Sequence, residues 1–472
     1  MKMMASKLEN FTISEASNLI KIGELSPIEL TQAFLERIEK FEKDLNAYIT
    51  VLFDQAISSS EAAENALSSD QYLGPLHGVP IALKDIFATK DVLTTSGSKI
   101  FSDHVPKLNA TVVERLNSAG AVLLGKLNML EFATGDINNP TYGATRNPWD
   151  LQRTTGGSSS GSGAAVAASL CLGSLGTDTG GSVRIPSSLC GIVGMKPTYG
   201  RVSRFGVTPL SWSLDHVGPM TKTVADTAIM LQVIAGSDPK DPTSLKQPVP
   251  NYLEALTGDI HGLKIGVPRK YFFDIIDKEV EEATNKAIKK LNNLGSEVTE
   301  VTFKNMRHVH SSRNIITSCE AASYHDGFFD IHLQDYDPRV ITNRILPGRF
   351  IPAVYYLKAQ RFRSIFTKEI EKLFKLVDVF VTPTTPIPAF NIEEYYVKIG
   401  TERVNARSAL GRLTQAFNLT GLPSITVPCG FTSLGLPIGL QIIAKRFEET
   451  MALRVAHTYE INTPWHKRRP KI

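Results

Sequence analysis

Apolar residues recur along this chain at two spacings, and each spacing predicts a different kind of element. After a helix start at Ser26-Pro27, intervals of 4, 4 and 3 residues mark one helix face: Leu30, Phe34, Ile38 and Phe41. Residues 277–294 form a second amphipathic helix that Gly295 ends. A capping box of Thr223 and Asp226 starts a further helix, which is expected to stop at Gly236.

Short apolar runs lie between the helical segments and predict buried strands. The candidates are residues 76–83, 121–124, 263–267, 298–303, 377–381, 425–427 and 440–443. Strands that alternate with helices predict an α/β fold with a mostly buried sheet. Because the sequence shows neither an internal repeat nor a clear linker, we expect one large domain over residues 1–472.

The composition fits a globular protein and excludes several other classes. Of 472 residues, 42% are apolar and 21% charged, so the chain is neither disordered nor fibrous. A net charge of +4 is too small over this length to predict a nucleic-acid partner. There is no run of 18 apolar residues, and the four cysteines are scattered, so we expect no membrane partner and a reducing, cytoplasmic location.

Residues 154–200 differ in composition because they are rich in Gly, Ser and Ala. A flexible linker is the simplest interpretation of such a tract. However, the tract leads into the small apolar run 164–172 and then into a second glycine-rich turn, residues 176–182. Two such turns around a buried element favour backbone held close to a ligand.

Three other motifs are weaker than they look. Gly157-Ser-Ser-Ser-Gly161 has the form of a nucleophile elbow, but polar residues precede it where a buried strand is required. Residues 120–126 are one residue short of a phosphate-binding loop, so we expect a strand and a turn there. His308 and His310, which we place on a strand or loop, have no further ligands at metal-binding spacing, so no metal is expected.

A serine nucleophile needs a base, and no histidine stands out for this task. Lys84 ends the apolar run 78–83, where its ammonium group would be desolvated. Burial can lower the pKa of a lysine by up to ~3–5 units, which makes it a usable base near neutral pH. The sequence alone does not place Lys84 beside any serine.

Three segments together resemble the amidase signature family. They are Gly78-Val-Pro-Ile-Ala-Leu-Lys-Asp85, Gly156-Gly-Ser-Ser-Ser-Gly-Ser-Gly-Ala-Ala165 and Gly176-Thr-Asp-Thr-Gly-Gly-Ser-Val-Arg-Ile-Pro186, followed by Gly194-Met-Lys-Pro-Thr198. The core of the resemblance covers residues 74–220, and residues 300–420 form the variable substrate-pocket region. The resemblance implies a mixed central β-sheet covered by helices on both faces.

The resemblance also implies a Ser-cisSer-Lys triad without a metal or organic cofactor. Ser182 is then the nucleophile, Ser158 the bridging serine on a cis peptide, and Lys84 the base and later the acid. The backbone N–H groups of Thr179, Gly180, Gly181 and Ser182 form the oxyanion hole, where side chains would block the approach. Ser159, Asp178 and Arg184 are interpreted as residues that fix the loop.

Two functions are compatible with the sequence. A scaffold that only binds a ligand is disfavoured, because all triad positions are present. One is a stand-alone hydrolase of small carboxamides, and the other is the glutaminase subunit of the tRNA-dependent amidotransferase. The chain departs from the usual pattern of that subunit at residues 130–135, 322–327 and 404–414, and the last segment lacks the acidic residue that would pair with the ammonium group of glutamine. We therefore favour the stand-alone amidase with a small-molecule amide substrate. The sequence does not decide the oligomeric state, and a homodimer stays open.

Overall fold

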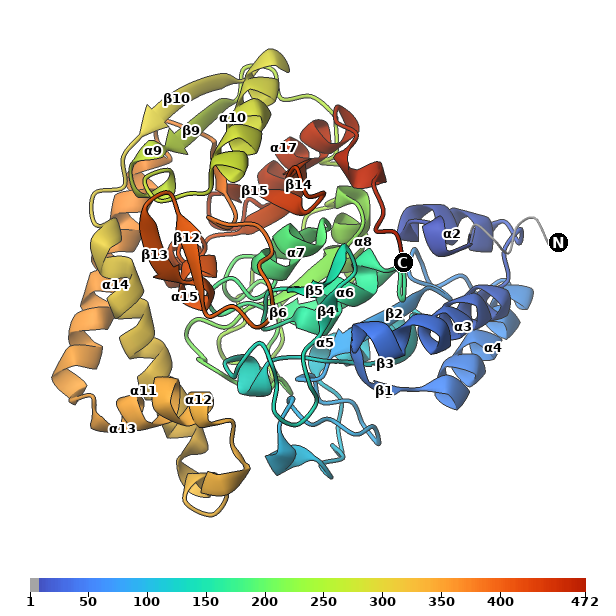
Figure 1. Ribbon diagram of the computed structural model, residues 1–472. Helices are drawn as coiled ribbons and strands as arrows, with labels where there is room; N and C mark the ends of the chain where they lie inside the picture. The colour runs from blue at the N-terminus through green and yellow to red at the C-terminus, as the bar shows by residue number, and fades with distance from the viewer. Residues whose placement is uncertain (1–7) are drawn as a thin grey trace.

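A central sheet of 11 strands organises the computed structural model, which describes residues 8–472 (Figure 1). In spatial order the strands are β1 (Tyr48–Val51), β3 (Val122–Leu127), β2 (Pro80–Lys84), β6 (Gly173–Thr177), β8 (Val217–Thr221), β7 (Val193–Lys196), β14 (Ser424–Phe431), β15 (Pro437–Ala444), β11 (Val379–Pro383), β9 (Lys264–Pro268) and β10 (Glu297–Val301). Parallel pairs occur at β3–β2–β6 and β11–β9–β10, and the other pairs are antiparallel. The predicted mixed α/β sheet is confirmed.

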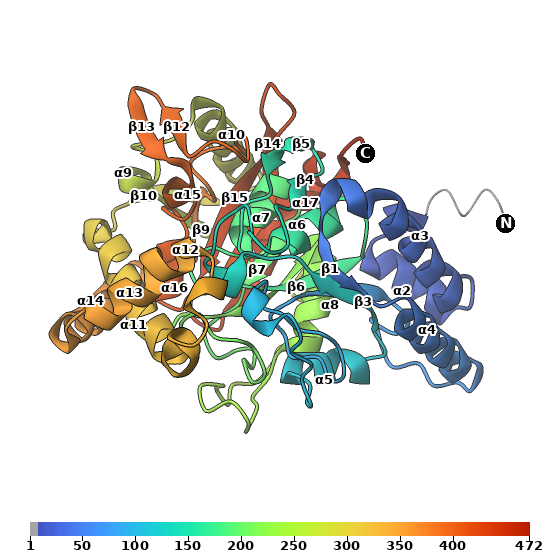
Figure 2. The ribbon, with the colours of Figure 1, turned by 60° about the horizontal axis from the view of Figure 1, so that its bottom comes forward.

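Helices cover both faces of the sheet, as Figures 1 and 2 show. Their bounds are α2 (Ile13–Lys21), α3 (Pro27–Leu45), α4 (Phe53–Ser68), α5 (Thr111–Ser118), α6 (Ser160–Ala167), α7 (Arg184–Cys190), α8 (Val224–Ile234), α9 (Arg269–Phe272), α10 (Lys278–Asn293), α11 (Val309–Phe329), α12 (Pro338–Val340), α13 (Leu346–Phe350), α14 (Ala353–Leu373), α15 (Ala406–Leu410), α16 (Gln415–Leu419) and α17 (Glu449–Ile461). Gly173 of β6 faces Met230 of α8, whereas Gly176 faces Ser159 at the start of α6. These two helices therefore lie on opposite faces of β6.

Several predicted elements form as expected. Ser26 caps α3, with Pro27 at its first position, and Leu30, Phe34 and Ile38 are buried on its inner face. The hydroxyl of Thr223 accepts a hydrogen bond from the Asp226 backbone N–H at the start of α8. The Asp226 carboxylate instead accepts from the Ser14 N–H, so this cap also ties α2 to α8.

Two predictions of local structure are wrong. Residues 76–79 lie in a turn, so β2 is shorter than the apolar run suggests. His308 ends a 3-10 helix and His310 lies in α11, not on a strand or loop. Residues 306–329 therefore continue from a 3-10 turn into a helix, and the alternation of two histidines carries no strand signal there.

The helices α11 and α14 pack against each other and form an arm beside the sheet, with α12 and α13 at its end (Figure 1). A π-helical segment, Ile341–Ile345, joins α12 to α13. Two hairpins complete the fold: β4 (Arg146–Asn147) with β5 (Asp150–Thr154), and β12 (Tyr396–Ile399) with β13 (Glu402–Asn405). The arm and the second hairpin both belong to residues 300–420.

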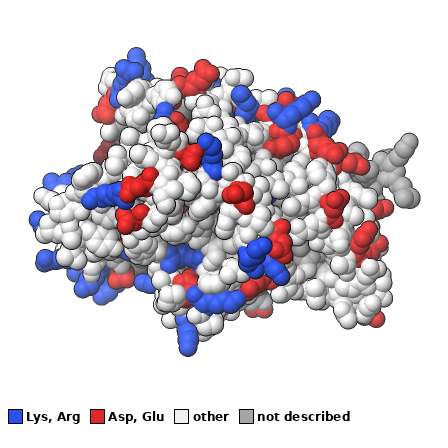
Figure 3. All heavy atoms as spheres, turned by 90° about the horizontal axis from the view of Figure 1, so that it is seen from below, with Lys and Arg blue, Asp and Glu red and all other residues white. Residues whose placement is uncertain are grey.

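The surface carries charges of both signs. On the face shown in Figure 3, Lys and Arg side chains are interspersed with Asp and Glu. Among residues 8–472, none of the helices is long and apolar enough to cross a membrane.

Candidate active site

Lys84 lies at the carboxyl end of β2, in the interior of the protein. Its amine donates hydrogen bonds of 2.8 Å to the hydroxyls of both Ser158 and Thr177. In the part of the chain that the structure describes, no carboxylate oxygen lies within 4 Å of this amine. Burial lowers the pKa of Lys84 to about 7, although Asp215 and Asp178 act in the opposite direction.

A second buried lysine, on the neighbouring strand, has different partners. Lys126 of β3 lies 3.1 Å from the carboxylate of Asp85 and also donates to Thr94 and to the Phe87 carbonyl oxygen. Lys126 is the lysine that makes residues 120–126 resemble a phosphate-binding loop. It lies inside a strand and is fully buried, so this run is not an open anion-binding loop. The expectation of a strand at this position is confirmed.

Ser158 follows a cis peptide bond after Gly157, the position at which the resemblance implies one. Its neighbour Ser159 is fully buried, and its hydroxyl donates to the Thr177 carbonyl oxygen at 3.2 Å. Ser159 also accepts from the Thr177 N–H, which ties the start of α6 to the end of β6. This buried position does not suit the nucleophile of an elbow and fits a residue that fixes the loop.

The turn that carries Ser182 is held by a buried ion pair. Arg184 lies 2.9 Å from the Asp178 carboxylate, which also accepts from the N–H groups of Gly181 and Val183 at 2.7 and 3.2 Å. Burial raises the pKa of Asp178, but Arg184 and then Lys196 outweigh it and hold the pKa well below its usual range. The carboxylate therefore stays charged and fixes the backbone on both sides of Ser182.

The four predicted oxyanion-hole groups are not equivalent. The Gly181 N–H donates to Asp178, whereas the N–H groups of Thr179, Gly180 and Ser182 have no acceptor among residues 8–472. Gly181 has a φ of +131°, a value that favours glycine. Three unpaired donors beside a serine hydroxyl suit an oxygen that gains negative charge during a reaction.

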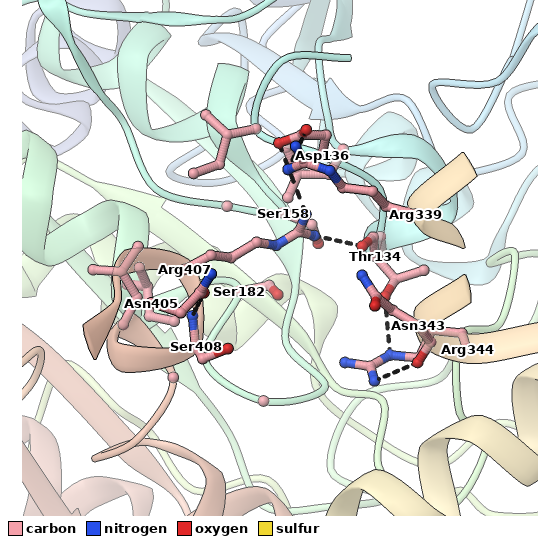
Figure 4. A pocket seen from close by; sticks show the side chains of 18 of the residues that line it. Thr134, Asp136, Ser158, Ser182, Arg339, Asn343, Arg344, Asn405, Arg407 and Ser408 are labelled. Carbon is pink, nitrogen blue, oxygen red and sulfur yellow. Dashed lines mark hydrogen bonds and ion pairs between the residues drawn. The ribbon is translucent and has the colours of Figure 1, made fainter. Parts of the chain in front are cut away.

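A cavity of about 610 Å³ opens in front of these serines. Ser158, Ser182, Gly157 and Gly180 line its floor, and Figure 4 shows both serine side chains among its lining residues. The opposite walls come from residues 310–347 and 390–415. Lys84 reaches the cavity only through Ser158, because its own side chain is fully buried.

Four arginines also line the cavity, and the sequence motifs gave no role to any of them. They are Arg313, Arg339, Arg344 and Arg407. Thr177, the second acceptor of Lys84, lies in the segment 176–186 that carries the family resemblance, but the resemblance implies no role for it. Basic residues recur every four or five positions along 339–349 and 403–412, but a solvated surface gives the same pattern, and Arg313 lies in neither range. No group of three potential metal ligands occurs among the described residues.

The fold and this site define an α/β protein in which a buried lysine contacts Ser158, at the floor of a cavity that Ser182 also lines. A sequence model of the Amidase family matches residues 29–453. A glutamyl-tRNA(Gln) amidotransferase subunit from Chloroflexus aurantiacus is 42% identical over 99% of this chain and 99% of its own. The protein belongs to the amidase signature family.

Solved structures of the family superpose over nearly the whole chain. A chain of the vestigial complex that reveals the evolutionary origins of an s-triazine catabolic enzyme has a TM-score of 0.92 and 35% identity, covering 98% of this chain and all of its own. The corresponding amidotransferase subunit of Thermotoga maritima has a TM-score of 0.82 and 34% identity, covering 97% of this chain and 96% of its own. The members with this fold therefore include both an s-triazine-related protein and an amidotransferase subunit.

Proposed function

We propose that this protein hydrolyses small carboxamides through an acyl-enzyme on Ser182. The observation that carries the proposal is the 2.8 Å contact between the Lys84 amine and the Ser158 hydroxyl, at the floor of a cavity that also exposes Ser182. The buried lysine of the neighbouring strand, Lys126, has a carboxylate partner in Asp85. Lys84 lacks one and has a pKa of about 7, which suits proton transfer at neutral pH.

In the acylation step, neutral Lys84 takes the proton of the Ser158 hydroxyl while Ser158 takes the proton of Ser182. The Ser182 oxygen attacks the amide carbon, and the carbonyl oxygen becomes an oxyanion that accepts from backbone N–H groups. The C–N bond then breaks as the proton returns from Lys84 through Ser158 to the leaving nitrogen. Water hydrolyses the ester on Ser182 by the same relay, and the acid is released.

A second candidate is the glutamine-hydrolysing subunit of a tRNA-dependent amidotransferase. The observation that favours it is the 42% identity to such a subunit over 99% of the chain. Under this candidate the chain works with partner subunits on glutamyl-tRNA(Gln) and releases ammonia from glutamine. The carboxylates that line the cavity argue against this candidate, because neither is free to bind the ammonium group of glutamine inside the cavity. Asp136 is paired with arginines, and Glu394 is exposed at the edge.

The test uses the purified chain alone. Ammonia release from pentanamide and from glutamine is measured for the wild type, for Ser182→Ala and for Ser162→Ala. Ser162 is the matched control, because it lies in the same serine-rich run and its hydroxyl donates to the Leu175 carbonyl oxygen. A fluorophosphonate should label Ser182 in the wild type and in the control.

Each outcome separates the candidates. Turnover by the chain alone, lost in Ser182→Ala and kept in Ser162→Ala, is expected from a stand-alone amidase. Glutamine hydrolysis that appears only after amidotransferase partner subunits are added identifies the second candidate. Labelling of a serine other than Ser182 rules out the acyl-enzyme as written.

A further inference from the structure

We propose that the substrate carries an anionic group, a carboxylate, at the end remote from the scissile amide, and carries no ammonium group. The arginines that line the cavity would bind this carboxylate, with Arg313 and Arg344 as the main contacts. The inference rests on the proposed function, since it names the substrate class of the same site. It starts from the unequal number of guanidinium and carboxylate groups around the cavity.

Arg313 lies directly against the nucleophile turn. It projects from α11, and a Cβ added to Gly180 would lie 2.5 Å from its Nη2 atom, so the guanidinium rests on the backbone of that turn. Its Nη1 donates to the Asn314 side chain, while its buried Nε has no acceptor. No carboxylate among residues 8–472 pairs with this guanidinium within 4 Å. Arg313 therefore keeps unused donors next to Ser182.

Arg344 reaches the cavity from the π-helical segment at the end of the arm. Figure 4 shows it entering from the side of Asn343, with Ser182 across the cavity. Its Nε donates to the Thr134 hydroxyl at 3.1 Å and its Nη1 to the Asn343 carbonyl oxygen at 2.9 Å. These neutral acceptors hold the side chain without neutralising it, and the described residues offer it no ion pair.

The carboxylates of the cavity are engaged elsewhere. Asp136 pairs with Arg339 and lies 4.0 Å from Arg407, and Arg407 also donates to the Thr134 carbonyl oxygen. Figure 4 shows this cluster on one wall, with Arg407 extended across the cavity. Glu394 is exposed at the edge and accepts from a backbone N–H of its own loop. With four arginines and two acidic residues, the lining has a formal charge of 4 − 2 = +2.

The mutual repulsion of the arginines supports the same conclusion. Burial lowers the pKa of Arg344 to about 9, and the charges of Arg313 and Arg407 act in the same direction. Guanidinium groups that gather in a low-dielectric site without a counter-ion are stabilised by an anionic ligand. Arginine suits a carboxylate in particular, because its planar donors match the two carboxylate oxygens. An ammonium group beside Arg313 and Arg344 would be repelled, and the two acidic residues of the lining are paired with arginines or exposed at the edge.

The compounds that meet both requirements are monoamides of dicarboxylic acids. Glutaramate, its amino derivative glutamine and the uncharged pentanamide form a matched set of probes, since they share the scissile primary amide. We expect kcat/KM for glutaramate to exceed that for each of the other two by at least about 10-fold. Arg344→Met and Arg313→Met should raise KM for glutaramate at least about 10-fold and change KM for pentanamide less than about 3-fold. Arg361→Met, on the exposed face of α14, is the control and should leave all three values unchanged.

A binding experiment separates this inference from the catalytic proposal. Glutaramate is titrated calorimetrically into Ser182→Ala and into Ser182→Ala with Arg344→Met. Binding that the second substitution weakens at least about 10-fold supports the anion site even if no amide is turned over. Ser182-dependent turnover that prefers pentanamide or glutamine, or binding of glutaramate that is indifferent to Arg344 and Arg313, overturns the inference while leaving the acyl-enzyme intact.

Discussion

Lys126 lies 3.1 Å from the carboxylate of Asp85, the residue that directly follows Lys84 in the chain. The two lysines stand on neighbouring strands, and both side chains are fully buried. Asp85 is occupied by Lys126 and by the backbone and hydroxyl of Thr95. This pairing leaves Lys84 without a carboxylate partner, so burial can lower its pKa.

The first prediction concerns the stability of this pair. Lys126→Met leaves a buried carboxylate uncompensated and should lower the free energy of unfolding by ~3–5 kcal/mol at pH 7. Burial raises the pKa of Asp85 even with Lys126 present. Without the lysine the folded-state pKa rises further above its unfolded value, so the lost stability should return as the pH falls. Denaturant unfolding at several pH values measures this.

The control for this prediction is the double variant Lys126→Met with Asp85→Asn, which removes both charges. It should be more stable at pH 7 than the single variant. A single variant that unfolds at the wild-type denaturant concentration would contradict the account of the pair.

The second prediction is the pH dependence of the reaction. Only neutral Lys84 accepts a proton, and its pKa is about 7. The rate should therefore rise with pH through one ionisation near pH 7 and reach a plateau above it. Lys84→Met and Lys84→Arg should each lose at least ~10²–10⁴-fold in kcat, because neither side chain can accept the proton at these pH values.

Circular dichroism and thermal unfolding provide the control for the lysine variants. Lys84→Met should fold at least as stably as the wild type, because it removes an amine whose charged form burial disfavours. Activity retained in Lys84→Met, with the pH step unmoved, would exclude the proposed relay.

The third prediction concerns Thr177, which accepts a hydrogen bond from the Lys84 amine at 2.8 Å. A hydrogen bond to the charged form of a group favours that form. Thr177→Val removes the acceptor, so the pKa of Lys84 should fall and the step in the pH–rate profile should move to lower pH. Thr177→Ser keeps the hydroxyl and should keep the step. An unmoved step in Thr177→Val would mean that this contact does not influence Lys84.

Three of the strands that apolar patterning missed lie next to the site. β6, β7 and β8 carry glycines and small polar residues instead of apolar runs. Their glycines allow close contacts: a Cβ on Gly194 would collide with Ser187, and one on Gly218 with the Met195 carbonyl oxygen. Apolar patterning detects strands that pack through large side chains, and it is blind to strands that pack through backbone.

Apolar patterning failed to predict the residues that line the cavity for a related reason. The buried face of α11 includes Ser312, Arg313, Thr317 and Glu320, so it has no apolar stripe. Arg313 lines the cavity and Glu320 accepts hydrogen bonds from Ser211 and Ser213, so the burial of these polar positions depends on the fold of distant segments. The motifs near Lys84, Ser158 and Ser182 could be found because each is a compact run of sequence. The arginines reach the cavity from three separate segments and share no motif.

The last prediction concerns Gly181, next to the proposed nucleophile. Its φ of +131° favours glycine, and a Cβ there would collide with the Thr414 hydroxyl and lie 2.6 Å from the Ile185 Cδ1 atom. Thr414 cannot simply move away, because its hydroxyl donates to the Gly180 carbonyl oxygen at 2.6 Å. Gly181→Ala must therefore displace the turn that holds Ser182 and the three unpaired N–H groups.

A displacement of about 1 Å at a reacting group costs on the order of 10²-fold in rate. We therefore expect Gly181→Ala to lower kcat about 10²-fold or more, with a smaller change in KM, since the arginines of the cavity lie on other segments. Gly327→Ala is the matched control: it lies in α11 with no atom near the added Cβ. Helix propensity predicts that this control gains ~0.5–1 kcal/mol of stability and keeps its activity. Steady-state kinetics and thermal unfolding of both variants test this prediction. A fully active Gly181→Ala would show that the turn tolerates a side chain and does not position Ser182 as described.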